Sequence, residues 1–429
     1  MPSKKLLFLE SIRGLAAFSV VINHLIGVFY PILNTNGLDT SRGDIMKHGF
    51  LARMIAVSPF SIVHNGNLAV QIFFMLSGVV LSLSYFRKKD PAILTSAALR
   101  RYFRLMIPAL ASVLFAWLII KIHGYYDLQA ATLMGRGPDG ACPIIADRSF
   151  FEAFKLGAYG IFFDPHVDLS INAPLWTMPI ELQGSFLIFA FLALIGPLTN
   201  RPVIYVVLAA LCFFTNRIAL FDFLAGVLIC DAYIALEKRN FRTAFPLYWG
   251  LPALALGILL GGLKEVWVIN LIRSYLGHGV HTSNGVHQAI TTMPPPPALP
   301  LTELGVLSIP AAFFIIASVM LCPALQAAFH AKVFLFLGRI SFPLYLFHMP
   351  VIHSLGCFTY TRLWALHMTH LSSTLGASFV SIVASVLLAW AAYHAIDLPS
   401  IRFGRVFDEW IKSVTMPWHN WTAGGGGKG

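Results

Sequence analysis

The stretch LLFLESIRGLAAFSVVINHLI, residues Leu6–Ile26, has the length and apolar character of a membrane-spanning helix. It nevertheless contains Arg13, Asn23 and His24. A charged side chain inside hydrocarbon costs at least about 2.5 kcal/mol, so such groups usually face a protein interior or a water-filled cavity. The spacing of Arg13 and His24 places both on one helix face, about 16 Å apart along the axis. This face is predicted to present a cation and an imidazole to a polar space, although polar groups that only meet partners within a helix bundle are the simpler alternative.

The rest of the chain has the composition of a polytopic membrane protein. Of its 429 residues, 57% are hydrophobic and 11% are charged, whereas a soluble domain carries about 25% charged residues. The predicted fold is all-α, with transmembrane helices that form a bundle around a buried polar cavity. The apolar segments of roughly spanning length number about ten: 6–26, 67–85, 103–123, 174–197, 202–216, 218–236, 247–264, 304–322, 338–357 and 373–396.

A further apolar segment, FFEAFKLGAYGIFF at residues 150–163, is too short to cross a membrane. It follows a predicted span and precedes another one. We therefore expect it to be re-entrant or to lie at the membrane interface.

Lysine and arginine residues gather in the loops on the side of the N-terminus. The formal net charge is +11, and with the N-terminus inside, the inner loops hold more basic residues than the longer outer loops. Basic residues accumulate on the cytoplasmic side of membrane proteins, so both termini of this multi-pass integral membrane protein are predicted to be cytoplasmic. The positive charge is thus assigned to the lipid bilayer and an anionic cytoplasmic substrate, and not to nucleic acid.

The densest positive patch lies in LRRYFRLMIP, residues 99–108. Arg101 and Arg104 are three residues apart at the start of a predicted span, so they lie on nearly the same side of a helix. Guanidinium groups bind phosphate oxygens through two parallel hydrogen bonds. These arginines are therefore candidates for binding an anionic substrate, and the general excess of positive charge on the inner side is the alternative explanation.

Two further spans contain titratable groups. Glu181 lies in APLWTMPIELQGSF, and His348 lies in GRISFPLYLFHMPV between Pro343 and Pro350. A carboxylate at this depth requires a cation or water, so Glu181 is expected either to pair with an intramembrane arginine or to bind a polar substrate. Helices interrupted at membrane depth tend to line cavities, which makes His348 a candidate for the same space.

Six of these stretches resemble, in order, the motifs of the membrane-bound acyltransferase family 3, which includes many sugar O-acetyltransferases. RGLAAFSVVINH resembles its Arg–ten residues–His signature. The other matching stretches are FFMLSGVVLS, RRYFRLMIP, LWTMPIELQ, RISFPLYLFHMPV and IDLPSIRFGR. The sequence departs from the family pattern at Thr177 to Pro179, at Phe342 and at Asp397, which concerns the geometry of the substrate site.

The resemblance covers about residues 6–406 and implies an acyl-CoA-dependent O-acyltransferase domain of that extent. Residues 407–429 are then a C-terminal tail, and its last six residues, GGGGKG, look like a linker. The implied reaction moves an acetyl or other short acyl group from cytoplasmic acetyl-CoA to a hydroxyl-bearing acceptor, without a metal.

The resemblance also implies roles for the candidate residues. His24 would be the catalytic histidine, acting either as a general base or as a nucleophile that accepts the acetyl group. Glu181 and His348 would line the acceptor or transfer region. The implied acetyl-CoA-binding residues are Arg13, Arg101 and Arg104.

The acceptor and the function class have alternatives. A sugar or glycan is the expected acceptor, and a small hydroxylated metabolite such as a macrolide, terpenoid or glycolipid is the alternative within the same chemistry. Intramembrane charges and broken helices also fit a proton-coupled transporter, although no internal repeat is visible. A scaffold protein would leave the intramembrane charges without a use.

Overall fold

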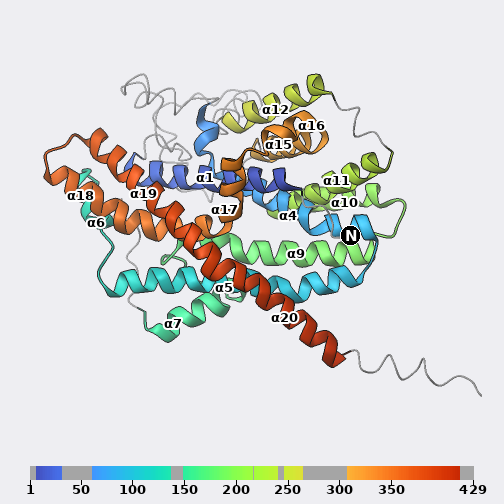
Figure 1. Ribbon diagram of the computed structural model, residues 1–429, viewed down its shortest axis with the longest axis horizontal. Coiled ribbons are helices and arrows are strands. Elements are labelled where there is room, and N and C mark those ends of the chain that lie inside the picture. The colour runs from blue at the N-terminus through green and yellow to red at the C-terminus, as the bar shows by residue number, and fades with distance from the viewer. Residues whose placement is uncertain are drawn as a thin grey trace, which may run out of the picture. The chain divides into compact units, whose positions relative to one another are not determined.

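The computed structural model describes residues 6–30, 60–136, 148–215, 217–239, 246–263 and 307–415. Regular secondary structure in these ranges is entirely helical (Figure 1), so the predicted all-α membrane class is confirmed. Within the described ranges, seven helical stretches are long and apolar enough to cross a membrane: Leu7–Phe29, Gly66–Lys88, Ala92–Lys121, Ala173–Leu194, Ala219–Lys238, Lys332–Ala365 and His370–Val414. The remaining three predicted spans coincide with shorter apolar helices, namely Val203–Cys212, Leu247–Gly262 and Ser308–Leu321.

The chain divides into two compact units. Unit 1 comprises Met1–Val80 and Leu198–Gly338, and unit 2 comprises Leu81–Pro197 and Arg339–Gly429. The boundaries fall inside α4 (Gly66–Lys88) and α17 (Lys332–Val351), so two continuous helices belong to both units.

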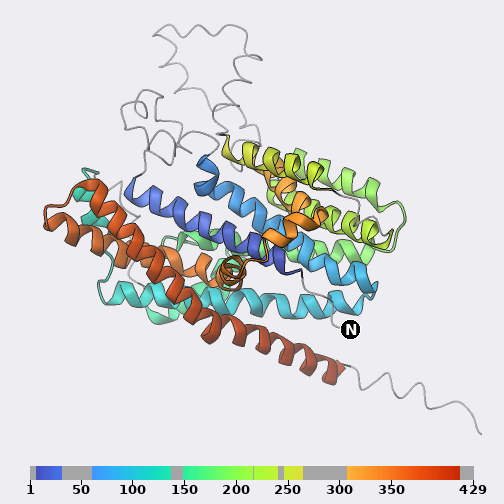
Figure 2. The ribbon, with the colours of Figure 1, turned by 45° about the horizontal axis from the view of Figure 1, so that its top comes forward.

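Unit 1 is built on close helix contacts. Figures 1 and 2 show α12 (yellow) beside α15 (orange), and these two helices pack against each other. Arg201 at the start of α10 binds the Asp231 carboxylate of α11 with two parallel hydrogen bonds of 2.6 and 2.8 Å, which joins that pair of helices. Besides the first part of α4, the helices of this unit are α1 (Leu7–Phe29), η2 (Phe60–His64), α10 (Arg201–Phe214), α11 (Ile218–Lys238), α12 (Leu247–Gly262), α15 (Ser308–Leu321), α16 (Pro323–Ala328) and the first turns of α17.

The backbones of α1 and α17 touch beside Arg13. A Cβ atom added to Gly14 would lie 2.4 Å from the backbone nitrogen of Gly338, and one added to Gly338 would lie 2.4 Å from the carbonyl oxygen of Glu10. Only glycine permits this approach, so the residue that follows Arg13 fixes how α1 meets α17.

Replacing Gly14 with alanine is expected to lower the free energy of unfolding by about 1–3 kcal/mol, because the added methyl group meets backbone atoms that cannot move aside. Thermal unfolding in detergent measures the change. Gly160→Ala is the matched control, since its Cβ would have no neighbour closer than 3.4 Å. Equal melting temperatures for the two variants would contradict the contact.

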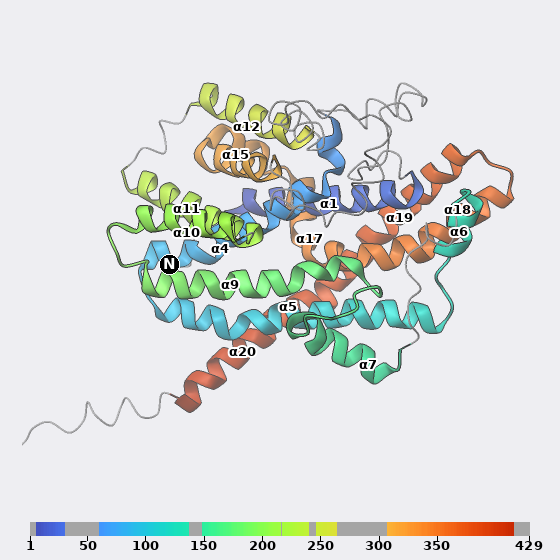
Figure 3. The ribbon, with the colours of Figure 1, turned by 180° about the vertical axis from the view of Figure 1, so that it is seen from behind.

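Unit 2 is organised around α5 (Ala92–Lys121), which contacts α9 on one side and α7 and α20 on others (Figure 3). The remaining elements are α6 (Asp127–Leu133), α7 (Phe150–Lys155), η4 (Leu156–Gly160), α8 (Ile161–Phe163), η5 (Ala173–Trp176), α9 (Thr177–Leu194), the later turns of α17, η7 (Ile352–Gly356), α18 (Cys357–Ala365), α19 (His370–Ala392), η8 (Tyr393–Asp397) and α20 (Leu398–Thr415). The domain boundary predicted after residue 406 falls inside α20.

The segment around residues 150–163 folds back along α5. The Trp117 indole donates a hydrogen bond of 2.9 Å to the carbonyl of Arg148, and the Tyr102 hydroxyl donates to the carbonyl of Ala158. Trp117 and Tyr102 are separated by about 22 Å of helix, most of the hydrocarbon thickness of a bilayer. The segment therefore runs along α5, and its re-entrant or interfacial position in the membrane stays a prediction.

The chain that follows this segment returns to the level of its start. Arg148 Nη2 lies 2.5 Å from Asp168 Oδ2, and the backbone N–H of Ser170 donates to Asp168 Oδ1 at 2.9 Å. The Ser170 N–H and the Arg148 guanidinium both favour the carboxylate form, so they lower the pKa of Asp168 below its ordinary value. The ion pair between Arg148 and Asp168 therefore joins the start of this segment to the chain that follows it.

Candidate functional site

Unit 1 contributes α1 with its two predicted site residues. The helix is continuous from Leu7 to Phe29, so the eleven-residue spacing of Arg13 and His24 is helical as predicted. Both side chains are half-buried. Beside them, Asn23 packs against the start of α4, where a Cβ added to Gly66 would lie 2.9 Å from Asn23 Nδ2. The residue that precedes His24 in α1 is thus fixed by close packing.

Unit 2 brings Arg101 and Glu181 together. Arg101 Nη2 lies 2.5 Å from Glu181 Oε2, and Arg101 Nε donates a hydrogen bond of 2.6 Å to the hydroxyl of Ser185. Side-chain exposure is only 10% for Arg101 and 11% for Glu181. Of the two roles expected for Glu181, the structure therefore shows the pairing with an arginine, which joins α5 to α9.

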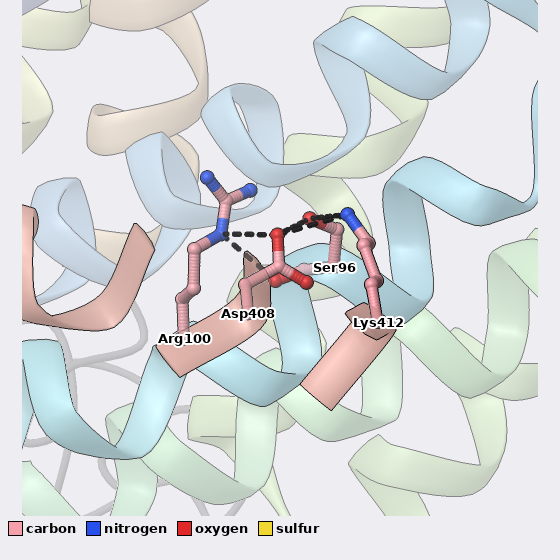
Figure 4. A network of polar contacts seen from close by, with 4 residues as sticks. All are labelled: Ser96, Arg100, Asp408 and Lys412. Carbon is pink, nitrogen blue, oxygen red and sulfur yellow. Dashed lines mark hydrogen bonds and ion pairs between the residues drawn. The ribbon is translucent and has the colours of Figure 1, made fainter. Parts of the chain in front are cut away.

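Arg100 faces a different partner. Its Nε donates a hydrogen bond of 2.8 Å to the Ser96 carbonyl and lies 4.0 Å from Asp408 Oδ2. Lys412 Nζ lies 3.0 Å from the same carboxylate oxygen, to which the Ser96 hydroxyl also donates (Figure 4). Asp408 is buried, and its Oδ2 accepts hydrogen bonds from Ser96 on α5 and Lys412 on α20, with the Arg100 guanidinium as a third, more distant positive neighbour.

Asp408→Asn is expected to lower the free energy of unfolding by about 1–3 kcal/mol, because hydrogen bonds to a charged acceptor become hydrogen bonds to a neutral one. The neighbouring variant Glu409→Gln removes a charge from an exposed position of α20 and serves as the control. Chemical denaturation of the two variants checks the difference. Equal losses would show that the contact of Asp408 with α5 contributes nothing.

Arg104 differs from Arg100 and Arg101 in its contacts. It is half-buried, and within the part of the chain that the structure describes, it has no hydrogen bond or ion pair. Its two neighbouring arginines, Arg100 and Arg101, each lie within 4.0 Å of a carboxylate. Of the three guanidinium groups in this turn of α5, Arg104 therefore keeps its charge available for an external anion.

His348 lies on the part of α17 that belongs to unit 2 and is fully buried. Its Nδ1 lies 3.1 Å from the carbonyl oxygen of Leu344, and because a carbonyl oxygen can only accept, Nδ1 donates this hydrogen bond. The short helix η5, which directly precedes α9, contacts the same part of α17. There the Tyr345 hydroxyl donates a hydrogen bond of 2.9 Å to the carbonyl of Pro174 and lies 3.0 Å from Thr177 Oγ1.

The six predicted site residues thus fall into two groups. Arg13 and His24 share α1 in unit 1, whereas Arg101, Arg104, Glu181 and His348 belong to unit 2. The structure joins Arg101 to Glu181, and a meeting of the His24 imidazole with the unit 2 residues stays a prediction. Among the described residues, no cluster of three or more His, Cys, Asp or Glu side chains could hold a metal ion.

Asp408 and Tyr345 were not singled out from the sequence. The spacing of Asp408 and Lys412, one helical turn apart, was a signal for the first. Asp408 lies beyond the last stretch that resembles a family motif, in the predicted C-terminal tail. Tyr345 carried no signal beyond its position in RISFPLYLFHMPV.

Comparison with known proteins agrees with this architecture. The acyltransferase domain family, Acyl_transf_3, matches residues 6–394. The O-acetyltransferase PaAT-1 of Phomopsis amygdali is 25% identical over an alignment of 445 residues, which covers 93% of this chain and 83% of the relative. No solved structure matches the chain. Since the family match covers nearly all of the chain, the protein belongs to the membrane-bound acyltransferase family 3 and is a membrane O-acyltransferase.

Proposed function

We propose that the protein transfers an acetyl group from cytoplasmic acetyl-CoA to a hydroxyl of a sugar or glycan acceptor. Membership of an acyltransferase family supports the reaction class, and the similar Phomopsis amygdali protein is named an O-acetyltransferase. In this proposal both termini are cytoplasmic, so that the first turns of α5 face the compartment that contains acetyl-CoA.

Arg104 is the observation that carries the proposal. Coenzyme A is a polyanion, and a guanidinium group without an internal carboxylate partner is suited to its phosphates. Arg101 is already bound to Glu181, so the first phosphate contact is assigned to Arg104, with Arg101 fixing the adjacent wall. Arg13 is proposed to contact the donor at a second point.

The proposed chemistry uses the His24 imidazole. The acceptor hydroxyl oxygen attacks the thioester carbonyl carbon, the carbon–sulfur bond breaks, and the hydroxyl proton passes to His24 and then to the coenzyme A thiolate. The products are an O-acetyl ester and coenzyme A. An acetyl group carried temporarily on the imidazole is the alternative route to the same products. Glu181 and His348 are assigned to the wall of the acceptor region.

Release of the coenzyme A thiol from acetyl-CoA tests the proposal. Purified protein in nanodiscs is given acetyl-CoA with or without a panel of oligosaccharides, and free thiol is measured over time. We expect thiol release to require an oligosaccharide and to be matched by an alkali-labile acetyl ester on it. Release with small hydroxylated metabolites and not with sugars would move the acceptor to that class, and no release with either class would contradict the proposal.

A further inference from the structure

The turn of α17 that contains His348 has a gap in its hydrogen bonding. In an α-helix, each carbonyl accepts a hydrogen bond from the N–H four residues later. Proline has no N–H, so Pro350 cannot supply the donor for the carbonyl of Leu346. A buried carbonyl that loses its donor destabilises the fold unless another group replaces that donor.

Asn172 supplies a replacement from outside the helix. Its Nδ2 donates a hydrogen bond of 2.9 Å to the carbonyl oxygen of Leu346 and lies 3.3 Å from the hydroxyl of Ser112 on α5. The side chain is only 2% exposed. Its amide therefore joins α17 to α5 at the carbonyl that Pro350 leaves without a helical donor.

The backbone around Asn172 is itself fixed. The Asn172 N–H donates to the carbonyl of Leu169 at 3.0 Å, and the Leu175 N–H donates to the carbonyl of Asn172 at 3.2 Å. Two residues after Asn172, the Pro174 carbonyl accepts the hydrogen bond from Tyr345, the residue that precedes Leu346. Residues 172–174 thus form hydrogen bonds with two consecutive residues of α17, Tyr345 and Leu346.

We propose that Asn172 is a positioning residue for His348, acting through the Leu346 carbonyl. His348 lies between Leu346 and Pro350 in the same helical turn, so the path of this turn sets the place of the imidazole. The amide of Asn172 holds this turn in place through the hydrogen bond that Pro350 cannot supply. This inference rests on the proposed function, because it assigns His348 a place in the transfer region.

Asn172→Leu tests the proposal, because leucine is similar in size and has no donor. We expect kcat for acetyl transfer to fall about tenfold while KM for acetyl-CoA stays within about twofold of wild type, since the donor contact at Arg104 is not altered. Ser112→Ala is the matched control, because it removes the other contact of the same amide and leaves the Leu346 carbonyl bonded.

A second background makes the test specific. Pro350→Ala restores a helical N–H for Leu346, so Asn172→Leu is expected to lower kcat much less in that background than in the wild type. If Asn172→Leu fails to fold, recovery of folded protein in the Pro350→Ala background supports the proposal, and failure in both backgrounds overturns it. An unchanged kcat, or the same loss of kcat in both backgrounds, also overturns it. The absence of transfer by the wild-type protein would instead contradict the proposed function.

Discussion

Replacing His24 with alanine is expected to lower acetyl transfer by about 10²–10⁴-fold, the contribution typical of a positioned general base or acid. The half-buried imidazole lies on the face of α1 that also presents Arg13, and an alanine side chain cannot take up the hydroxyl proton. The affinity for acetyl-CoA should stay close to that of the wild type, because its phosphates are assigned to α5. Transfer rates and coenzyme A binding are measured on the same preparation.

The control for this variant is His367→Asn. His367 is an exposed histidine after α18 with a backbone φ of 60°, a conformation that asparagine tolerates. It should transfer acetyl groups at the wild-type rate. Full activity of the His24→Ala protein would end the assignment of His24 to catalysis. If the activity is lost, a brief exposure of the wild type to labelled acetyl-CoA, followed by denaturation, tests whether the imidazole carries the acetyl group.

Replacing Arg104 with alanine is expected to raise KM for acetyl-CoA by about 10- to 100-fold, which corresponds to the loss of a hydrogen bond to a charged group of about 1.5–3 kcal/mol. The value of kcat at saturation should change little, because this contact is made equally in the ground state and the transition state. Arg104→Lys should recover part of the affinity, since lysine keeps the charge and loses the forked geometry.

The matched control is Arg239→Ala, which removes an exposed arginine at the end of α11 in unit 1. It changes the net charge by the same amount and should leave KM unaltered. Raising the salt concentration should weaken binding to the wild type more than to Arg104→Ala, because exposed charge interactions are screened. A KM of Arg104→Ala equal to that of the control would remove Arg104 from the donor site.

The helical periodicity of α1 and α5 was predictable from the sequence alone. The spacing of Arg13 and His24 fixed their common face, and the need of a buried carboxylate for a cation limited Glu181 to two roles. The spans at 202–216, 247–264 and 304–322 were found at the right places, but their helices are shorter than the other spans, because hydropathy does not determine where a helix ends.

The partners of the arginines on α5 could not be predicted, because they depend on contacts between distant parts of the chain. Arg101 meets a residue 80 positions away, and Ser96 meets one 312 positions away. Local sequence makes Arg101 and Arg104 equivalent, whereas the packing of α9 against α5 engages Arg101 and leaves Arg104 available. The hydrogen bond from Asn172 could not be predicted either, because its acceptor lies on α17, 174 positions away in the chain.

The most direct test of the account follows a labelled acetyl group. Membranes that contain the wild-type protein, His24→Ala or Arg104→Ala are incubated with acetyl-CoA labelled in the acetyl group and with the oligosaccharide panel, and label in alkali-labile esters is counted. The account predicts ester formation by the wild type, almost none by His24→Ala, and recovery by Arg104→Ala when acetyl-CoA is raised. Equal ester formation in all three membranes would contradict it.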